Sequence, residues 1–490
     1  MEIREALTFD DVMLVPGSSD FYPSDADVSS VCARGIKLNI PVLSAAMDTV
    51  TESDMAIAMA QAGGLGVIHR NLPIDEQRHH VARVKRFESA VVDDPITLHP
   101  NQTVGDAHAL QLKHKITGFP VVDEKHRIVG ILTNRDLRFL DDPEILVCDI
   151  MTSKSLITTR HPIDIKKARQ AMRESRVEKV IVLDDDRRCI GLLTISDIEK
   201  SVLHPQACKD DRGRLRVAAA STIGDTGFER SIALIDAGAD VIAIDTAHGH
   251  SKFVIQAVER LRKYSDEVCI IAGNVATADG VRALADAGAD GIKVGIGPGS
   301  ICTTRIIAGV GIPQITAIMD CAKAAAEYGI PVIADGGVKF SGDIAKAIAA
   351  GASCVMVGSI LAGTDEAPGE IFLYNGRSCK SYRGMGSIGA MAKGAADRYF
   401  QNKNQEHTKF VPEGVEGQVP CKGLVSAIVH QLVGGLRAAM GYTGNKTISE
   451  MQKNSNFVRI TACGLSESHV HNVQIVREAP NYHYGVKESL

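Results

Sequence analysis

The chain has 490 residues, of which 45% are hydrophobic and 23% charged, so it can bury a large core and form more than one domain. The chain has 54 Lys and Arg residues against 59 Asp and Glu residues. It has no basic arm or acidic tail, so neither nucleic acid nor a membrane surface is expected as the main partner. Trp is absent and aromatic residues make up only 4%, which argues against a platform that stacks nucleic-acid bases.

Cysteine usage and the length of the apolar runs indicate the compartment. The eleven cysteines have no repeated spacing and follow no secretory leader, which predicts reduced thiols in the cytoplasm. No apolar run reaches the roughly 18 residues of a membrane-spanning helix, so no such helix is expected.

The first 90 residues predict the start of a parallel α/β sheet. Short apolar runs within 40–48 and 63–69 are expected to be buried strands, joined by a helix over 53–62. Strand, helix and strand at this spacing make a βαβ unit, which implies a parallel sheet.

Between residues 91 and 205 the chain repeats itself with an offset of 61 residues. Each copy predicts strand, helix, strand, strand and helix, so residues 91–148 and 149–205 are expected to form a tandem pair. The matched positions include Val121 and Val182, Gly130 and Gly191, Thr133 and Thr194, and Asp136 and Asp197.

Both copies end in Gly-x-x-Thr-x-x-Asp, and in this they resemble a pair of cystathionine-β-synthase (CBS) domains. The resemblance implies a regulatory module in which Asp136 and Asp197 bind the ribose of a purine nucleotide. The alternative is that these segments only cap helices. Capping would account for Thr133 and Thr194 but not for the aspartates, which favours nucleotide contact.

Strand and helix alternate again from about residue 215. Apolar runs predict six further strands, within 215–220, 241–248, 268–274, 291–296, 331–337 and 354–359. Helical spacing fills the gaps between them, for example over 227–237, 280–287 and 342–350. Together with the two earlier strands, this is the layout of a (β/α)8 TIM barrel, whose active site gathers at the carboxyl ends of the strands.

The barrel is expected to be interrupted twice. Residues 1–90 and 206–490 supply its strands, so residues 91–205 are an insertion. The alternation also stops over 360–440, and a segment this long with little periodicity is either disordered or a functional lid.

A glycine-rich loop after the run 291–296 carries a candidate nucleophile. The closely spaced glycines allow a tight turn near a ligand, and Cys302 follows at its tip. The Arg305 cation is expected to favour the thiolate of Cys302, which would suit nucleophilic catalysis. The alternative is a buried, inert cysteine beside an ordinary turn.

Two further strand ends predict a phosphate site. The segments 335–337 and 358–359 each follow a strand just before an expected helix, where free backbone N–H groups can cradle a phosphate. Asp335 beside this cradle suits a ribose diol, because a carboxylate accepts from both hydroxyls. The alternative is that these glycines serve only tight βα turns.

Four segments together resemble the inosine-5′-monophosphate (IMP) dehydrogenase family: residues 295–305, 334–337, 382–386 and 397–399. The Cys-Thr-Thr-Arg sequence is similar to the bacterial type, and the likeness runs over essentially the whole chain. GMP reductase shares the cysteine loop and is the alternative enzyme, although it usually lacks the insert and the Arg-Tyr segment. A non-catalytic nucleotide sensor built on the CBS pair is the alternative from another class.

The resemblance implies NAD⁺-dependent oxidation of IMP to XMP, the committed step of guanine nucleotide synthesis. Cys302 would attack C2 of the purine ring, and the resulting thioimidate would be hydrolysed by Arg398 and Tyr399 of a flap over about 380–420. Thr304 would help to orient the water. From chemistry alone, His, Glu or Asp is the expected base and Arg398 an exposed loop cation.

The resemblance also implies binding residues. Those for IMP are Ser300, Asp335, Gly336, Gly337, Gly358, Ser359, Tyr382, Arg383, Gly384, Met385, Gly386 and Glu413. Those for the dinucleotide are Asp245, Gly295, Ile296 and Gly297. No Gly-x-Gly-x-x-Gly opens a helix after a first strand, so NAD⁺ is not expected on a Rossmann fold.

A potassium ion and an oligomer are implied in the same way. The K⁺ ligands would be Gly297, Gly299 and Cys302, with Glu467, Ser468 and His469 from a neighbouring subunit. A homotetramer is expected, and its pairing into an octamer stays open. The residues alone predict either a solvated polar turn or a His-x-His metal site over 467–471.

Overall fold

The computed structural model describes residues 3–87, 92–93, 95–114, 116–138, 140, 142–160, 165–195, 198–199, 203–401 and 409–482. The chain divides into two compact units. The larger comprises Met1–Lys85, Gln206–Cys208 and Arg216–Leu490, and the smaller comprises Arg86–Pro205 and Lys209–Leu215. Among the described residues, no helix is both long enough and apolar enough to cross a membrane.

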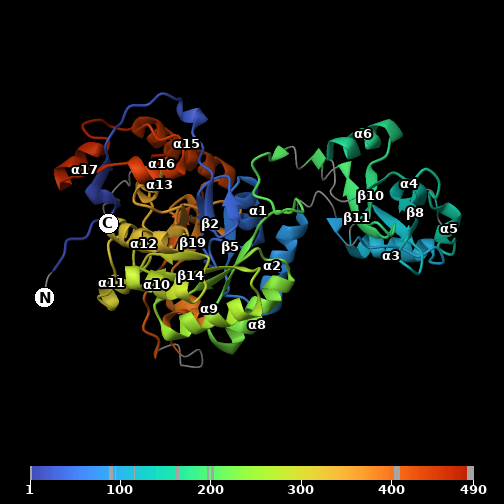
Figure 1. The fold of residues 1–490 in the computed structure, drawn as a ribbon, viewed down its shortest axis with the longest axis horizontal. Coiled ribbons are helices and arrows are strands. Elements are labelled where there is room, and N and C mark those ends of the chain that lie inside the picture. Colours follow the sequence, from blue (N-terminus) through green and yellow to red (C-terminus); the bar gives the residue numbers. More distant parts are fainter. Residues whose placement is uncertain are drawn as a thin grey trace. The chain divides into compact units, whose positions relative to one another are not determined.

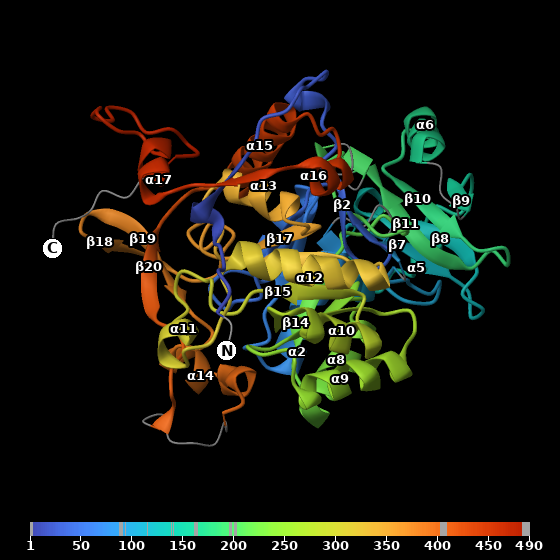
Figure 2. The same cartoon turned by 60° about the vertical axis from the view of Figure 1, so that its left-hand side comes forward.

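The larger unit is built on a closed barrel of eight parallel strands (Figures 1 and 2). In chain order these are β4 (Val42–Ser44), β5 (Leu65–Ile68), β12 (Ala218–Ser221), β13 (Val241–Asp245), β14 (Cys269–Val275), β15 (Gly291–Val294), β16 (Val332–Asp335) and β17 (Cys354–Val357). Each overlaps the range expected from the sequence, and nearly all of their residues are buried. Such apolar runs are typical of parallel strands, which are covered on both faces.

Eight helices follow the eight strands and complete a (β/α)8 barrel, which confirms the predicted fold class. They are α1 (Ser53–Gln61), α2 (Ile74–Phe87), α8 (Gly224–Asp236), α9 (Lys252–Tyr264), α10 (Ala278–Asp286), α12 (Gln314–Tyr328), α13 (Ser341–Ala349) and α15 (Val425–Thr443). The helix that follows β17 is α15, and it begins only after a long insertion. The expectation that a helix directly follows residues 358–359 is therefore wrong. The carbonyl of Gly358 instead accepts the N–H groups of Leu361 and Ala362 in a turn.

A hairpin packs against the amino ends of the barrel strands. It consists of β2 (Ser30–Ala33) and β3 (Ile36–Leu38), whose apolar side chains join the core cluster of the barrel. The thiols of Cys208, Cys269 and Cys354 donate to hairpin carbonyls at 3.5, 3.1 and 3.6 Å. All eleven cysteines are free. The amino end is therefore packed, which leaves the carboxyl end for a site.

The segment between β17 and α15 is folded where it is described. Its strands β18 (Ile371–Tyr374), β19 (Arg377–Arg383) and β20 (Glu416–Pro420) form an antiparallel sheet, with Tyr382 opposite Gly417. Between β19 and β20 lie α14 (Ile388–Ala392) and the 3-10 helix η3 (Ala395–Tyr399). Residues 402–408 of the expected flap lie outside the described residues.

Short elements complete the larger unit. They are η1 (Phe9–Asp11), β1 (Val12–Leu14), η2 (Pro23–Asp25), α11 (Thr304–Ile307), α16 (Ile448–Asn454), β21 (Phe457–Arg459) and α17 (Ala462–Ser468). Strand β1 pairs with β21, so the two ends of the larger unit meet in one antiparallel pair.

The smaller unit shows the sequence repeat in its elements. The first copy has α3 (Val104–His114), β7 (Gly118–Val122), β8 (Ile128–Thr133) and α4 (Asn134–Leu137). The second has α5 (Val147–Ile150), β9 (Thr158–Arg160), α6 (Ile165–Ser175), β10 (Lys179–Leu183) and β11 (Cys189–Thr194). Helix α6 and strands β10 and β11 begin and end 61 residues after α3, β7 and β8 (165 − 104, 179 − 118, 189 − 128). Strand β6 (Val92–Asp93) pairs with β11, so the start of the module joins the sheet of the second copy.

Asp136 has a structural role that the sequence argument missed. Its Oδ2 accepts hydrogen bonds from both the N–H and the hydroxyl of Thr133, each at 2.7 Å, at the start of α4. A capping box of this kind uses both the Thr and the acidic residue three positions later. Capping therefore accounts for Asp136 as well as Thr133, contrary to the expectation. Asp197 lies outside the described residues.

The unit boundaries predict how the insertion can be removed. Joining residue 85 to 206 through a short flexible linker should leave a folded barrel, because the core cluster of the barrel contains only residues of the larger unit. Circular dichroism and thermal unfolding would measure this. The control deletes 86–208 and so removes the Cys208 N–H bond to Ala60 (2.7 Å) and the Asn39 bond to Gln206 (2.8 Å). The control should have a free energy of unfolding about 1–3 kcal/mol lower than that of the first deletion. Equal stability of the two deletions would contradict the assigned boundary.

Candidate active site

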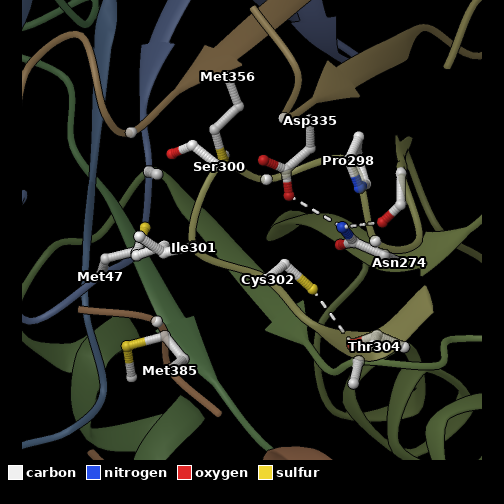
Figure 3. A pocket seen from close by; sticks show the side chains of 18 of the residues that line it. Met47, Asn274, Pro298, Ser300, Ile301, Cys302, Thr304, Asp335, Met356 and Met385 are labelled. Carbon is white, nitrogen blue, oxygen red and sulfur yellow. Dashed lines mark hydrogen bonds between the residues drawn. The ribbon is translucent and has the colours of Figure 1, made fainter. Parts of the chain in front are cut away.

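A cavity opens at the carboxyl ends of the barrel strands, where the sequence predicted the site (Figure 3). Loops after β4, β13, β15, β16 and β17 line it, together with Asn274 near the end of β14 and the segment that follows β17. The sequence-predicted residues in its wall are Asp245, Gly295, Ile296, Gly297, Gly299, Ser300, Cys302, Thr304, Asp335, Gly336, Gly337, Gly358, Ser359, Tyr382, Gly384, Met385, Arg398, Tyr399 and Glu413. Arg383, Gly386, Glu467, Ser468 and His469 do not line it.

The loop after β15 presents Cys302 to this cavity. A Cβ on Gly295 would lie 2.1 Å from the carbonyl oxygen of Asp335, so only glycine fits where the loop leaves the barrel. The Cys302 N–H donates to the carbonyl of Gly299 at 3.1 Å. Its thiol donates to the Thr304 hydroxyl at 3.1 Å, a contact visible in Figure 3. The loop therefore fixes both the nucleophile candidate and the hydroxyl beside it.

Arg305 shapes this loop instead of bonding to the thiol. Its Nε and Nη2 donate to the carbonyls of Ile296 (3.1 Å) and Ile312 (2.7 Å). A Cβ on Gly297 would meet the Arg305 side chain at 2.5 Å, so glycine is needed there for the guanidinium to pack. Burial lowers the pKa of Arg305, and the charge of Cys302 opposes this shift. The hydrogen bonds of Arg305 thus hold the shape of the loop, and the effect of its charge on the Cys302 thiol stays a prediction.

A buried lysine, which the sequence analysis did not single out, connects two of the predicted carboxylates. Lys293 of β15 lies 2.7 Å from Oδ1 of Asp245 and 2.6 Å from Oδ2 of Asp335. Asn274 Nδ2 donates to the same Asp335 oxygen at 2.9 Å and to the carbonyl of Gly295 at 2.7 Å (Figure 3). The sequence signal was present, because Lys293 interrupts an apolar run with a charge that has to be paired when buried.

The Arg398 side chain is only 13% exposed, so the expectation of an exposed loop cation is wrong. Its Nη1 forms an ion pair with Oδ2 of Asp245, and its carbonyl accepts the N–H of Ala247 at 3.0 Å. Burial lowers the pKa of Arg398 below its usual value, whereas it raises that of Tyr399. Tyr399 packs on Gly386, where a Cβ would lie 2.7 Å from its ring. The Arg-Tyr segment therefore occupies the predicted dinucleotide side of the cavity.

Strand ends on the far side of the barrel hold this segment in place. Asp397 forms an ion pair with Arg70 at 2.7 Å and accepts the Thr222 hydroxyl at 3.1 Å. Arg70 follows β5 and Thr222 follows β12. Neither was predicted, because their partner is more than 170 residues away in the sequence. The flap is thus anchored immediately beside Arg398.

Arg383 makes a different contact from the one expected. Its Nε lies 3.2 Å from both oxygens of Asp48 and its Nη2 lies 2.5 Å from Oδ2. Burial would raise the pKa of Asp48, but Arg383 and the 2.8 Å bond from Asn71 lower it below its usual value. The Arg383 side chain therefore joins the flap to the loop after β4 and does not line the cavity.

Close backbone approach shapes the predicted phosphate cradle. Gly336 and Gly337 have φ angles of +90° and +84°, and a Cβ on either would lie 3.0 or 3.3 Å from Pro298. Tyr382 closes the cradle from the flap, and a Cβ on Gly358 would lie 3.2 Å from its hydroxyl. Burial raises the pKa of Tyr382 to about 12, so its hydroxyl stays a neutral donor.

The expected K⁺ ligands from the C-terminal part lie elsewhere in this chain. Glu467 and Ser468 end α17 and are exposed, and the Ser468 hydroxyl donates to the carbonyl of Gly464 at 2.7 Å. His469 Nδ1 lies 3.2 Å from the hydroxyl of Tyr482. Over the described ranges, no group of three or more His, Cys, Asp or Glu residues is arranged to hold a metal ion. The alternative of a His-x-His metal site is therefore unsupported.

The buried position of Lys293 predicts a loss of stability when its charge is removed. Lys293→Met should lower the free energy of unfolding by about 3–5 kcal/mol, because Asp335 loses its cation and Asp245 keeps only the guanidinium of Arg398. The matched control is Lys339→Met, which removes an exposed pair with Asp10 at 2.5 Å and should cost about 1 kcal/mol or less. Urea unfolding measures both. Equal losses in the two variants would show that the charge network contributes little.

Comparison with known proteins agrees with the family that the motifs resemble. The model of the family described as "IMP dehydrogenase / GMP reductase domain" matches residues 6–471. The chain is 57% identical to the inosine-5′-monophosphate dehydrogenase of Rhizobium tropici, over 96% of this chain and 95% of the relative. It is 55% identical to that of Aquifex aeolicus (98% of both chains) and 55% identical to that of Pasteurella multocida (99% of both).

A solved GMP reductase structure is also similar. It is a cysteine-to-alanine variant of the protein from Trypanosoma brucei in complex with guanosine 5′-monophosphate, with 41% identity and a TM-score of 0.85 over 96% of this chain and 99% of that one. A match this complete cannot omit residues 91–205, so the presence of the insertion does not distinguish the two activities. Sequence identity separates them better, because the chain is 53–57% identical to the inosine-5′-monophosphate dehydrogenases and 41% identical to this GMP reductase. The chain belongs to the IMP dehydrogenase / GMP reductase family, among the inosine-5′-monophosphate dehydrogenases.

Proposed function

We propose that this protein catalyses the NAD⁺-dependent oxidation of IMP to XMP, the committed step of guanine nucleotide synthesis, with Cys302 as the covalent nucleophile. The observation that carries the proposal is that Cys302, the predicted phosphate cradle and the carboxylates of Asp245 and Asp335 line one cavity. Cys302 Sγ adds to C2 of the purine ring, the C2 hydrogen leaves as hydride, and water then hydrolyses the resulting thioimidate and releases the thiol. When bound, NAD⁺ would accept this hydride.

IMP is held from three sides in this proposal. Backbone and hydroxyl groups of the cradle bind the phosphate, and Asp335 binds the ribose. Lys293 and Asn274 occupy Oδ2 of Asp335, which leaves Oδ1 to accept from the ribose diol. The base lies over Cys302, next to the flap. The residues for these contacts are Ser300, Asp335, Gly336, Gly337, Gly358, Ser359, Tyr382, Gly384, Met385, Gly386 and Glu413.

The dinucleotide would use Asp245 together with residues 295–297. The position of Asp245 supports this assignment. Its carboxylate forms an ion pair with the guanidinium of Arg398 and can equally accept a hydrogen bond from a ribose hydroxyl. The flap and the dinucleotide thus need the same carboxylate, so Arg398 has to withdraw before the dinucleotide binds. When Arg398 returns, it and Tyr399 lie beside Cys302 and Thr304 for hydrolysis. The lowered pKa of Arg398 favours this role.

A potassium ion would complete the loop. The carbonyls of Gly297 and Cys302 accept no hydrogen bond from any residue that the structure describes, and that of Gly299 accepts only the Cys302 N–H. Carbonyl oxygens are suitable K⁺ ligands. Glu467, Ser468 and His469 of a second copy would add to them, because Glu467 and Ser468 are exposed. This arrangement requires a homo-oligomer, which we take to be a tetramer.

The smaller unit would bind purine nucleotides as a regulatory CBS pair. A cavity of about 860 Å³ lies within it, lined by Thr133, Asp136, Glu178 and Lys179 among others. Asp136 uses Oδ2 for its capping box, so a ribose would contact its other oxygen; Asp197 is the corresponding residue of the second copy. Eleven free cysteines support a cytoplasmic location.

The nucleophile gives the first test of the function. The unmodified protein should form NADH from IMP and NAD⁺, whereas a GMP reductase would consume NADPH with GMP. Cys302→Ala should lower NADH formation by about 10⁴-fold or more while IMP still binds, because phosphate and ribose contacts lie elsewhere. The control Cys148→Ala removes an exposed thiol of the other unit and should change nothing. Appreciable NADH from the Cys302 variant would exclude covalent catalysis.

The flap gives a kinetic test. Arg398→Ala should leave hydride transfer nearly intact and slow hydrolysis by about 10²-fold or more, the scale of lost general-base catalysis. Rapid mixing should then show an NADH burst about equal to the enzyme sites, with covalent intermediate accumulating on Cys302. If the burst falls in proportion to turnover, Arg398 acts before or during hydride transfer and its assignment to hydrolysis is wrong.

A further inference from the structure

The phosphate cradle has no charged group of its own. The cations among the described residues that line the cavity are Lys293 and Arg398, and both are paired with carboxylates. The proposed phosphate contacts are backbone groups and the hydroxyls of Ser300, Ser359 and Tyr382. A phosphate group carries about two negative charges at neutral pH, so a counter-charge is to be sought in the layer behind the cradle.

Lys422 lies in that layer, directly behind one wall of the cradle. Its Nζ donates to the carbonyls of Ser359 at 2.8 Å and Ile360 at 3.0 Å, and its own N–H donates to the carbonyl of Gly363 at 2.8 Å. In a trans peptide C=O and N–H point in opposite directions, so the N–H of Ile360 is directed away from the lysine. The ammonium thus fixes and polarises the turn that follows Gly358.

Lys422 is a partly buried cation with no carboxylate partner among the described residues. The titratable groups on the segments around it are Lys380 and Tyr382 on β19, Asp365 and Glu366 after the turn, and Cys421 beside it in the chain. Lys380 donates to three other carbonyls, and Glu366 accepts the N–H of Val425. Burial lowers the pKa of Lys422 to about 8, with no opposing carboxylate.

We infer that Lys422 is a positioning residue for the substrate phosphate: it holds the Gly358–Ile360 turn from behind and supplies the positive charge that the cradle lacks. The inference rests on the proposed binding of IMP in this cavity. It makes phosphate recognition depend on the charge of a side chain that does not touch the substrate.

The charge has a consequence for pH. Lys422 is protonated below about pH 8 and neutral above it, and a nearby dianion favours the protonated form. The affinity for IMP should therefore be constant from pH 7 to about 8 and fall as the pH rises further. A fall of about tenfold corresponds to a pKa of Lys422 that rises by one unit on binding. The neutral amine can still donate to the turn, so this change reports the charge.

The experiment measures dissociation constants of IMP and of inosine for the full-length protein between pH 7 and 9.5. Inosine lacks the phosphate but shares the base and ribose, so the ratio of the two constants isolates phosphate recognition from every other titrating group. We expect the dissociation constant of inosine divided by that of IMP to fall about tenfold across the range. A flat ratio in the unmodified protein would overturn the inference without any variant.

Two variants separate charge from structure. Lys422→Met should weaken the binding of IMP about tenfold at pH 7 and leave the binding of inosine unchanged. The ratio of the two dissociation constants should then no longer vary with pH. Lys380→Met is the matched control, because this lysine also donates to backbone carbonyls, but to those of Thr364, Asp365 and Ala367 outside the cradle. It should keep the pH dependence.

The remaining outcomes are decisive as well. Equal weakening of IMP and inosine by Lys422→Met would mean that the lysine is merely structural, and this would overturn the inference. If Lys422→Met does not fold, Lys422→Arg should retain IMP affinity at pH 7 and abolish the fall above pH 8, because arginine stays charged. Failure of the unmodified protein to bind or oxidise IMP would instead refute the proposed function.

Discussion

The buried ammonium of Lys293 is the interaction on which the rest of the site depends. It lies between Asp245 and Asp335, so one cation holds together the carboxyl ends of β13, β15 and β16. Asn274 extends the link to Gly295, where the cysteine loop leaves the barrel. Removing three ionised groups from water costs several kcal/mol for each, and only close mutual pairing offsets this cost. The substrate side, the dinucleotide side and the nucleophile loop therefore share one electrostatic centre.

The barrel could be predicted because parallel strands leave a local signal. Each strand is a short buried apolar run that ends in glycine or polar residues, and this pattern needs no knowledge of distant partners. Boundaries shifted by a few residues, as for β12 at Ala218–Ser221 against the expected 215–220. The lining residues were located largely through motifs that resemble a known family. Lys293 and Asn274 were missed although both lie on predicted strands, because only the folded barrel brings Asp245 and Asp335 to them.

Residues whose partners are distant in the sequence could not be predicted. Arg70 pairs with Asp397 and Arg383 with Asp48, and no local pattern selects these carboxylates from the 59 acidic residues of the chain. Asp136 is the opposite case, because a local capping box that includes it was overlooked, although both of its residues lie within four positions of each other. Arg305 shows a third case, because its hydrogen bonds to the carbonyls of Ile296 and Ile312 have no signal in the local sequence.

The flap position places a limit on how stable its closed form can be. Arg398 contacts the carboxylate that we propose for the dinucleotide, and under that proposal closure and dinucleotide binding exclude each other at Asp245. Each 1.4 kcal/mol by which closure is favoured would weaken dinucleotide binding about tenfold. The buried pairs of Arg398 with Asp245 and of Asp397 with Arg70 look strong, but burying the guanidinium costs several kcal/mol and offsets much of the attraction. A closed flap held by desolvated ion pairs can therefore be well defined in geometry and still open readily, which a cavity that alternates between a dinucleotide and its own arginine requires.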